Sequence, residues 1–238
     1  MTDPTVRPSL RLPATLLLVG QLLYIVITQF HADGPANSHA TVFAEYARSG
    51  GWAAVHVGQF GAMAILVAGL FTLRFAQEVQ AGTASWASRL GAAAAVVALA
   101  LYGALQAVDG VANKQADVAW ANAPDAEKAA RFASAEAVRW VEWGLRSYHN
   151  FALGLALLLF AAAIVRTAWI ARPIGYLIGL SGLAYLAQGW VVGSEGFSQT
   201  NTILILVAWV LSLAWMIWFV VVAWRRHSST PSAELPRR

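Results

Sequence analysis

The sequence predicts an all-α fold: a bundle of six transmembrane helices, with both termini cytoplasmic and an amphipathic extension of helix 4 on the outer side. Of its 238 residues, 58% are hydrophobic and only 12% are charged, which is too little polar surface for an ordinary water-soluble domain. The apolar residues gather into six runs close to the roughly 20 residues that a helix needs to cross a bilayer. These runs are continuous and rich in Ala, Leu and Gly, whereas strands of a membrane barrel alternate.

The six spans follow one another along the chain, and the longest connection is 110–144. We expect them near residues 13–30, 52–75, 88–109, 145–166, 172–193 and 202–224. They belong to one transmembrane domain over residues 1–226, and the polar, proline-containing stretch 227–238 is expected to be a disordered cytoplasmic tail. The first run resembles a secretory signal, but it is long for one, so we expect a retained helix.

Basic residues indicate the orientation, because Lys and Arg accumulate on the cytoplasmic side of a membrane protein. They precede the first span, flank the connections after the second and fourth spans, and follow the last: Arg7, Arg11, Arg74, Arg89, Arg166, Arg172, Arg225 and Arg226. The long connection 110–144 is an exception, because it carries both basic and acidic residues. From Asn122 onward it has a helix cap, an early proline and good helix formers, so the fourth helix is expected to start outside the membrane.

The residue types restrict the chemistry. The chain has no cysteine, which excludes disulfides, thiolate metal sites, iron–sulfur clusters, c-type haem and cysteine nucleophiles. The net charge of +4 comes mostly from basic residues that bracket apolar segments, so membrane lipids are the expected partners and nucleic acid is not. Any chemistry must use His, Asp, Glu, Arg or Lys.

Several polar residues are expected at membrane depth. The apolar stretches 151–165 and 62–73 are too short to cross a bilayer alone, so their helices must extend back through polar residues. With the predicted orientation these polar groups lie in the outer half of the membrane, while the inner half is almost free of them. Because polar groups in hydrocarbon are costly and usually face a bundle interior or a cavity, we expect a shared, outward-facing pocket.

Roles in this pocket follow from residue type and spacing. We predict His149, Asp109, Glu142 and His56 as the catalytic acid/base set, because proton transfer needs groups of this kind. The predicted ligand-binding residues are Gln59, Gln106, Arg146, Asn150 and Gln188.

Glu142, Arg146 and His149 stand at i, i+4 and i+7, on one helix face. We therefore expect Glu142 to pair with Arg146 and to leave His149 free to act. The alternatives are structural: Arg146 and Glu142 pair at the headgroups, Asp109 ends a helix, and His56 is a packing residue.

The stretch "HADGPANSH", residues 31–39, suggests a metal clip because it contains His31, Asp33 and His39. No further acidic or histidine ligands stand nearby in the sequence, so we expect a solvated loop and predict no metal site.

Two stretches carry a family resemblance. They are "VDGVANKQADVAWANAPDAEKAARFASAEAVRWVEWGLRSYHNF" and "ARPIGYLIGLSGLAYLAQGWVVGSEGFS". An aspartate-glycine pair, an alanine-rich acidic helix and a glycine-rich penultimate span follow in this order, and the chain resembles actinobacterial multi-pass membrane proteins of unknown function. The resemblance covers roughly the C-terminal half. It implies a six-helix bundle in a bacterial plasma membrane and brings no activity with it.

Three functions stay open. The pocket binds or converts a small lipophilic molecule by isomerase- or cyclase-like acid/base chemistry, without a cofactor. Alternatively, His56 and His149 ligate a b-type haem, since bis-imidazole ligation needs a histidine on each side of the ring. The third possibility is a non-catalytic subunit or transporter-like protein that works as a homo-oligomer or with a membrane partner. The sequence leaves open whether the protein is an enzyme.

Overall fold

The computed structural model describes residues 9–32, 34–35, 37–76, 82–167 and 170–225. Within these residues every regular element is helical and none is a strand. Six helical segments are long and apolar enough to cross a membrane, which confirms the all-α class and the number of spans. The tail predicted at 227–238 lies outside the described residues.

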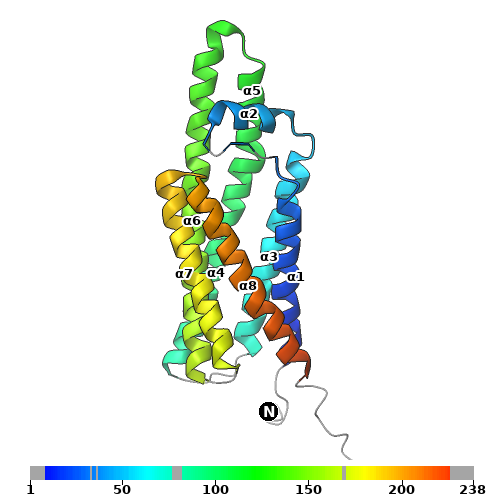
Figure 1. The fold of residues 1–238 in the computed structure, drawn as a ribbon, viewed down its shortest axis with the longest axis vertical. Helices are drawn as coiled ribbons and strands as arrows, with labels where there is room; N and C mark the ends of the chain where they lie inside the picture. The colour runs from blue at the N-terminus through cyan, green and yellow to red at the C-terminus, as the bar shows by residue number, and fades with distance from the viewer. Residues whose placement is uncertain (1–8, 33, 36, 77–81, 168–169, 226–238) are drawn as a thin grey trace, which may run out of the picture.

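Six long helices form the bundle (Figure 1). They are α1 (Arg11–Thr28), α3 (Trp52–Ala76), α4 (Thr83–Ala107), α6 (Asp125–Thr167), α7 (Arg172–Glu195) and α8 (Gln199–Arg225). Four of them match the predicted spans to within a few residues, because the length of an apolar run sets the length of the helix that crosses.

The segment 110–144, predicted as a connection outside the membrane, is almost entirely helical. The chain of α4 continues through one π-helical turn, η1 (Val108–Asn113), into α5 (Lys114–Ala121). After a short turn the chain reverses into α6, which is 43 residues long. The helix expected from Asn122 onward is present as α6 from Asp125, whereas the expectation of a loop at 110–121 is wrong. The two arms α5 and α6 extend past the ends of the other helices (Figure 1).

A short helix, α2 (His39–Arg48), crosses the same end of the bundle near α5 (Figure 1). Its buried side chains are Val42, Phe43 and Tyr46, which share one helix face and form a small apolar cluster with Trp52 and Ala135. We did not predict this helix from the sequence. The spacing of the apolar residues in "HATVFAEYAR" is typical of an amphipathic helix and could have indicated it.

The start of α1 and the end of α8 lie together at the opposite end of the bundle (Figure 1). The guanidinium of Arg11 lies 4.6 Å from the ring centroid of Trp224. Because the bundle has six long helices, an even number, the two ends of the described chain lie at the same end of the bundle. Which side is cytoplasmic stays a prediction.

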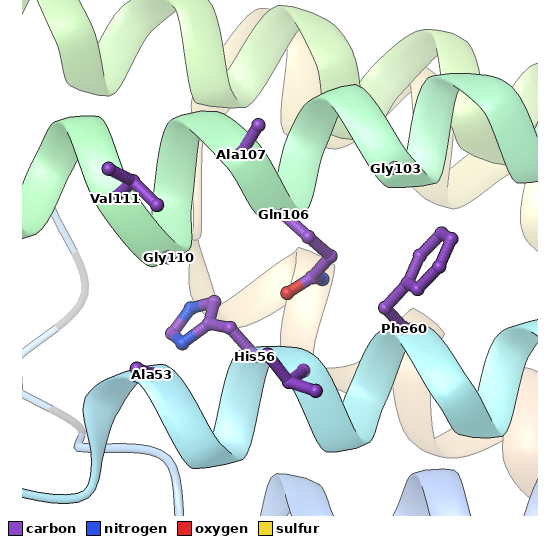
Figure 2. Close-up of a pocket in the computed structure, with 9 residues that line it drawn as sticks. Ala53, His56, Phe60, Gly103, Gln106, Ala107, Gly110 and Val111 are labelled. Atoms are coloured by element: carbon purple, nitrogen blue, oxygen red, sulfur yellow. The ribbon is translucent and has the colours of Figure 1, made fainter.

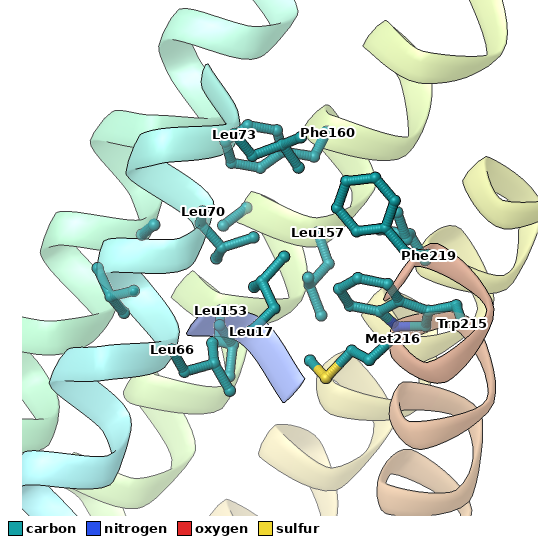
Figure 3. Packing of buried hydrophobic residues seen from close by; sticks show 14 of the residues in the cluster. Leu17, Leu66, Leu70, Leu73, Leu153, Leu157, Phe160, Trp215, Met216 and Phe219 are labelled. Atoms are coloured by element: carbon teal, nitrogen blue, oxygen red, sulfur yellow. The ribbon is translucent and has the colours of Figure 1, made fainter. Parts of the chain in front are cut away.

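The half of the bundle near these ends is packed with apolar side chains. Leucines of α1, α3 and α6 meet aromatic residues of α6 and α8, among them Leu17, Leu70, Leu157, Phe160 and Trp215 (Figure 3). Each of these side chains is at most 4% exposed. The core therefore lies toward one end and leaves the other to polar residues.

Helices α6 and α7 touch at paired glycines. A Cβ atom on Gly154 would stand 2.7 Å from the carbonyl oxygen of Gly182, and one on Gly182 would stand 2.8 Å from that of Gly154. The GxxxG pair Gly175 and Gly179 also faces α6, against Val165 and Ala161. Small residues thus let two backbones approach within one chain.

We predict that Gly154→Ala lowers the free energy of unfolding by about 1–3 kcal/mol, because the added methyl group must push α6 and α7 apart. Gly61→Ala is the matched control: a Cβ there meets nothing within 4 Å, and Ala is the better helix former by about 1 kcal/mol. Thermal unfolding of both variants in detergent measures the difference. Equal stability of the two variants would contradict the close contact.

Candidate functional site

The π-helical turn η1 places Asp109 against α3 and Asn113 against α6. Asp109 and Asn113 are 8% and 1% exposed, and the indole Nε1 of Trp52 donates a hydrogen bond of 2.9 Å to the backbone carbonyl of Asp109. A Cβ on Gly110 would stand 2.9 Å from the Cβ of His56. The glycine therefore lets α3 come close enough for His56 to reach Asp109. Such π turns are frequent at functional sites.

Two imidazoles flank the Asp109 carboxylate. Nε2 of His56 lies 3.1 Å, and Nε2 of His31 lies 3.8 Å, from the same oxygen, Oδ2. His31 comes from the loop after α1, and its ring packs against Trp52 and Tyr46 with centroid distances of 4.9 and 5.5 Å. The expectation of a solvated loop is wrong for His31. His39 is also held, at 2.9 Å from Glu136.

A hydrogen-bonded network links this carboxylate to α6. Nδ2 of Asn113 donates to Asp109 at 3.3 Å and to Glu142 at 2.6 Å. Nη1 of Arg139 donates to Glu142 at 2.7 Å. The predicted pair between Glu142 and Arg146 is wrong, because Arg139, three residues before Glu142, takes that carboxylate. Arg146 turns toward α1 instead and donates to the hydroxyl of Tyr24 at 3.1 Å.

The network also holds α2 in place. Lys114 donates to three backbone carbonyls at the end of α2, those of Tyr46, Ala47 and Ser49, at 2.7 to 2.9 Å. A cation at a helix C-terminus satisfies carbonyls that have no partner within the helix. Burial raises the pKa of Tyr46, so its hydroxyl stays protonated and accepts a hydrogen bond from Arg139.

These groups surround a cavity of about 540 Å³, which we call the polar cavity. Its wall comes from α1, the following loop, α2, α3, α4, α6 and α8. Charged and amide side chains line one part of it: His31, Gln59, Gln106, Asp109, Arg139, Glu142, Arg146 and Asn201. Apolar side chains of α8 line another part: Ile205, Leu206 and Trp209.

A second cavity of about 280 Å³, the side pocket, lies between α3 and α4. Figure 2 shows His56 of α3 and Gln106 of α4 projecting into this space, and Gln106 lines both cavities. The other lining residues are mostly small or apolar, and Val57 and Val111 are exposed on the outer face of the bundle. The side pocket therefore opens toward the surface that faces lipid if the six helices cross a membrane.

Four polar atoms in the wall of the polar cavity are buried without a hydrogen-bond partner among the described residues. They are Oε1 of Gln106, Nε of Arg139, Nε of Arg146 and Oδ1 of Asn201. A buried polar group without a partner costs roughly 1–3 kcal/mol. The wall of the polar cavity therefore carries part of this cost.

The structure brings together six of the nine residues predicted from the sequence. Around the two cavities lie His56, Gln59, Gln106, Asp109, Glu142 and Arg146. The other three are buried but line neither cavity: His149, Asn150 and Gln188. Nδ1 of His149 donates to the carbonyl of Ala98 at 2.9 Å. The structure therefore gives His149 a place in the packing between α4 and α6.

The arrangement does not bring the two proposed haem ligands to one space. His56 lies 2.7 Å from the carbonyl oxygen of Trp52 through Nδ1 and 3.1 Å from Asp109 through Nε2. His149 lies outside both cavities. Neither cavity has a histidine on each of two opposite walls at the positions that bis-imidazole ligation needs.

Four members of the site were not predicted: Tyr46, Asn113, Arg139 and Asn201. His31 was considered only as part of a metal clip, which was rejected. Arg139 stands three residues before Glu142 on α6, and this spacing was a usable signal. The other three reach the site through tertiary contacts, for which the linear sequence carries no signal.

Comparisons of the chain with models of protein families, with characterised proteins and with solved structures find no match. The resemblance to an actinobacterial membrane family stays a prediction.

We predict that Arg139→Met destabilises the protein by about 3–5 kcal/mol, because it leaves the buried Glu142 carboxylate without its cation. Arg131→Met on the same helix is the control, since its pair with Glu127 is about half exposed and is worth about 0–1 kcal/mol. Denaturation of both variants in detergent compares them. A loss no larger for Arg139→Met than for Arg131→Met would contradict the buried pair.

Proposed function

We propose that the chain is a multi-pass plasma-membrane protein whose polar cavity binds a small amphiphilic molecule and converts it by acid/base chemistry of the isomerase or cyclase kind. The observation that supports this most is the gathering of unpartnered buried polar atoms from α4, α6 and α8 around one cavity. Such atoms regain their lost hydrogen bonds when a polar group enters.

The charges favour an anionic or acceptor-rich headgroup. Arg146 is partly buried, with its Nε fully covered, and among the described residues no carboxylate lies within 4.0 Å of its guanidinium. A partly buried guanidinium that has only a hydroxyl partner gains from an anionic ligand group. The apolar wall of α8, with Ile205, Leu206 and Trp209, suits the lipophilic part of the same molecule.

The acid/base role belongs to the two carboxylates of the cavity wall. Asp109 and Glu142 share the amide of Asn113, so their oxygens are fixed side by side from two helices. General acid–base catalysis needs a donor and an acceptor within reach of one ligand. His56 supports Asp109 from the side pocket, and the opening of that pocket between α3 and α4 offers lateral entry for a lipophilic substrate.

We predict that protein purified in mild detergent carries a discrete lipophilic compound with a polar or anionic headgroup, detectable by mass spectrometry of its organic extract. Arg146→Gln should reduce the amount bound by about 10–100-fold, because a hydrogen bond to a charged group contributes about 1.5–3 kcal/mol. Arg48→Gln is the control, since Arg48 is 72% exposed and pairs with Glu45 on the outside of α2. Equal content in both variants, or none in the unmodified protein, would contradict the proposal.

The orientation is part of the proposal, with the arginine-rich end in the cytoplasm and the polar cavity toward the outside. The chain has no cysteine, so single cysteines report on each end. We predict that a membrane-impermeant maleimide labels Asn122→Cys in intact cells and labels Thr83→Cys only after permeabilisation. Both positions are exposed, at opposite ends of the bundle. The reverse labelling pattern would invert the topology.

A further inference from the structure

We propose that His31, His56 and Asp109 form a binding site for a divalent cation of the zinc class, at the junction of the polar cavity and the side pocket. The inference goes beyond the proposed function and does not depend on it, because it concerns side chains of this chain and an ion alone.

The hydrogen bonds of the two rings leave one nitrogen of each free to bind a metal. Nδ1 of His56 lies 2.7 Å from the carbonyl oxygen of Trp52, and Nδ1 of His31 lies 2.6 Å from that of Ala32. A carbonyl oxygen only accepts hydrogen bonds, so both Nδ1 atoms carry the proton. In the neutral imidazole the remaining nitrogen, Nε2, then presents a lone pair. A backbone carbonyl behind the ring is the usual support of a histidine ligand.

The free atoms converge. The two Nε2 atoms and Oδ2 of Asp109 all lie within 4.8 Å of one another, and the distances to Oδ2 are 3.1 and 3.8 Å. Metal–ligand bonds of 2.0–2.2 Å in a tetrahedral zinc site place neighbouring ligand atoms about 3.3–3.5 Å apart. The longest separation closes by a rotation of His31, the ligand that stands on a loop.

The contact between His56 and Asp109 lacks a hydrogen bond. Nε2 of His56 is buried, and among the described residues no acceptor meets the geometry of a hydrogen bond to it, although Oδ2 of Asp109 is 3.1 Å away. A lone pair on Nε2 and a carboxylate oxygen repel each other in a low-dielectric interior unless a proton or a metal cation lies between them. The side chain of His56 is 3% exposed, so water screens this repulsion poorly.

The surroundings fit a metal ligand set. Asn113 donates to the other oxygen of Asp109, Oδ1, at 3.3 Å, which orients the carboxylate and leaves Oδ2 for the ion. Two imidazoles and a carboxylate favour zinc or a similar transition metal over magnesium and calcium, which prefer oxygen ligands. Three protein ligands leave a fourth position. Because His31 and Asp109 also line the polar cavity, that position faces the cavity and is available to a water molecule or a donor atom of a ligand.

A proton shared by His56 and Asp109 also explains their short contact. This explanation and the metal site differ in the residues that they need. A shared proton needs only His56, whereas a metal site also needs His31. The variant His31→Ala therefore separates the two explanations. His31 stands on a loop and its side chain is 19% exposed, so His31→Ala removes the ring contacts with Trp52 and Tyr46 but changes no residue of the long helices.

The test uses the full-length chain in detergent, stripped with a chelator and then supplied with Zn²⁺ or Co²⁺. We expect a single Zn²⁺ per chain after desalting, and visible Co²⁺ absorption typical of four- or five-coordinate geometry. His31→Ala and Asp109→Asn should each weaken binding by more than about 100-fold, since loss of a supporting group alone costs about 10–100-fold. His39→Ala, at the start of α2 and paired with Glu136, should bind as the unmodified chain does.

Thermal unfolding in the same samples reports on folding. Zn²⁺ should raise the unfolding temperature of the unmodified chain and of His39→Ala, and should leave that of His31→Ala unchanged. Absence of Zn²⁺ binding, or binding that survives His31→Ala, would overturn the metal site. Neither result touches the proposed function, because the content of lipophilic ligand is measured on protein kept in chelator.

Discussion

The structure depends on the need of every hydrogen-bonding group inside an apolar bundle to find a partner within the protein. Asp109 is the clearest case, because a buried carboxylate in the π turn after α4 needs donors or cations that water would otherwise supply. The π turn, the missing side chain of Gly110 and the loop after α1 bring His56, Asn113 and His31 to it. The polar cavity is the space that remains between these groups and the amides and arginines opposite.

The two halves of the bundle therefore differ in how they are held together. In one half, leucines and aromatic rings interlock, and glycines allow α6 and α7 to touch. In the other half, directional hydrogen bonds from Arg139, Asn113 and Lys114 hold α2, α5 and α6 around the cavity. Apolar contacts are non-directional, so a side chain in the apolar core can pack in several ways. Hydrogen bonds are directional, so they fix the positions of the donor and acceptor atoms in the cavity wall.

The spans and the gathering of polar residues at one end were predictable, because both follow from the number of apolar residues available to cross a bilayer. The continuation of the α4 helix to residue 121 could not be predicted, because the residues after Gly110 have the polar composition of a solvated loop. The partner of Glu142 depended on a choice between Arg139 and Arg146, which stand on nearly the same helix face. His31 reaches Asp109 through the path of a loop, and His149 turns toward Ala98 through the rotation of α6. Tertiary contacts determine the positions of both histidines.

A cryo-EM map of the full-length chain in lipid nanodiscs tests the central claim most directly. The account predicts that the side chains of His31 and His56 meet the carboxylate of Asp109 in the wall of one cavity, with density connecting the three. A map in which His56 faces lipid, or in which the loop after α1 lies away from the π turn of α4, would contradict it.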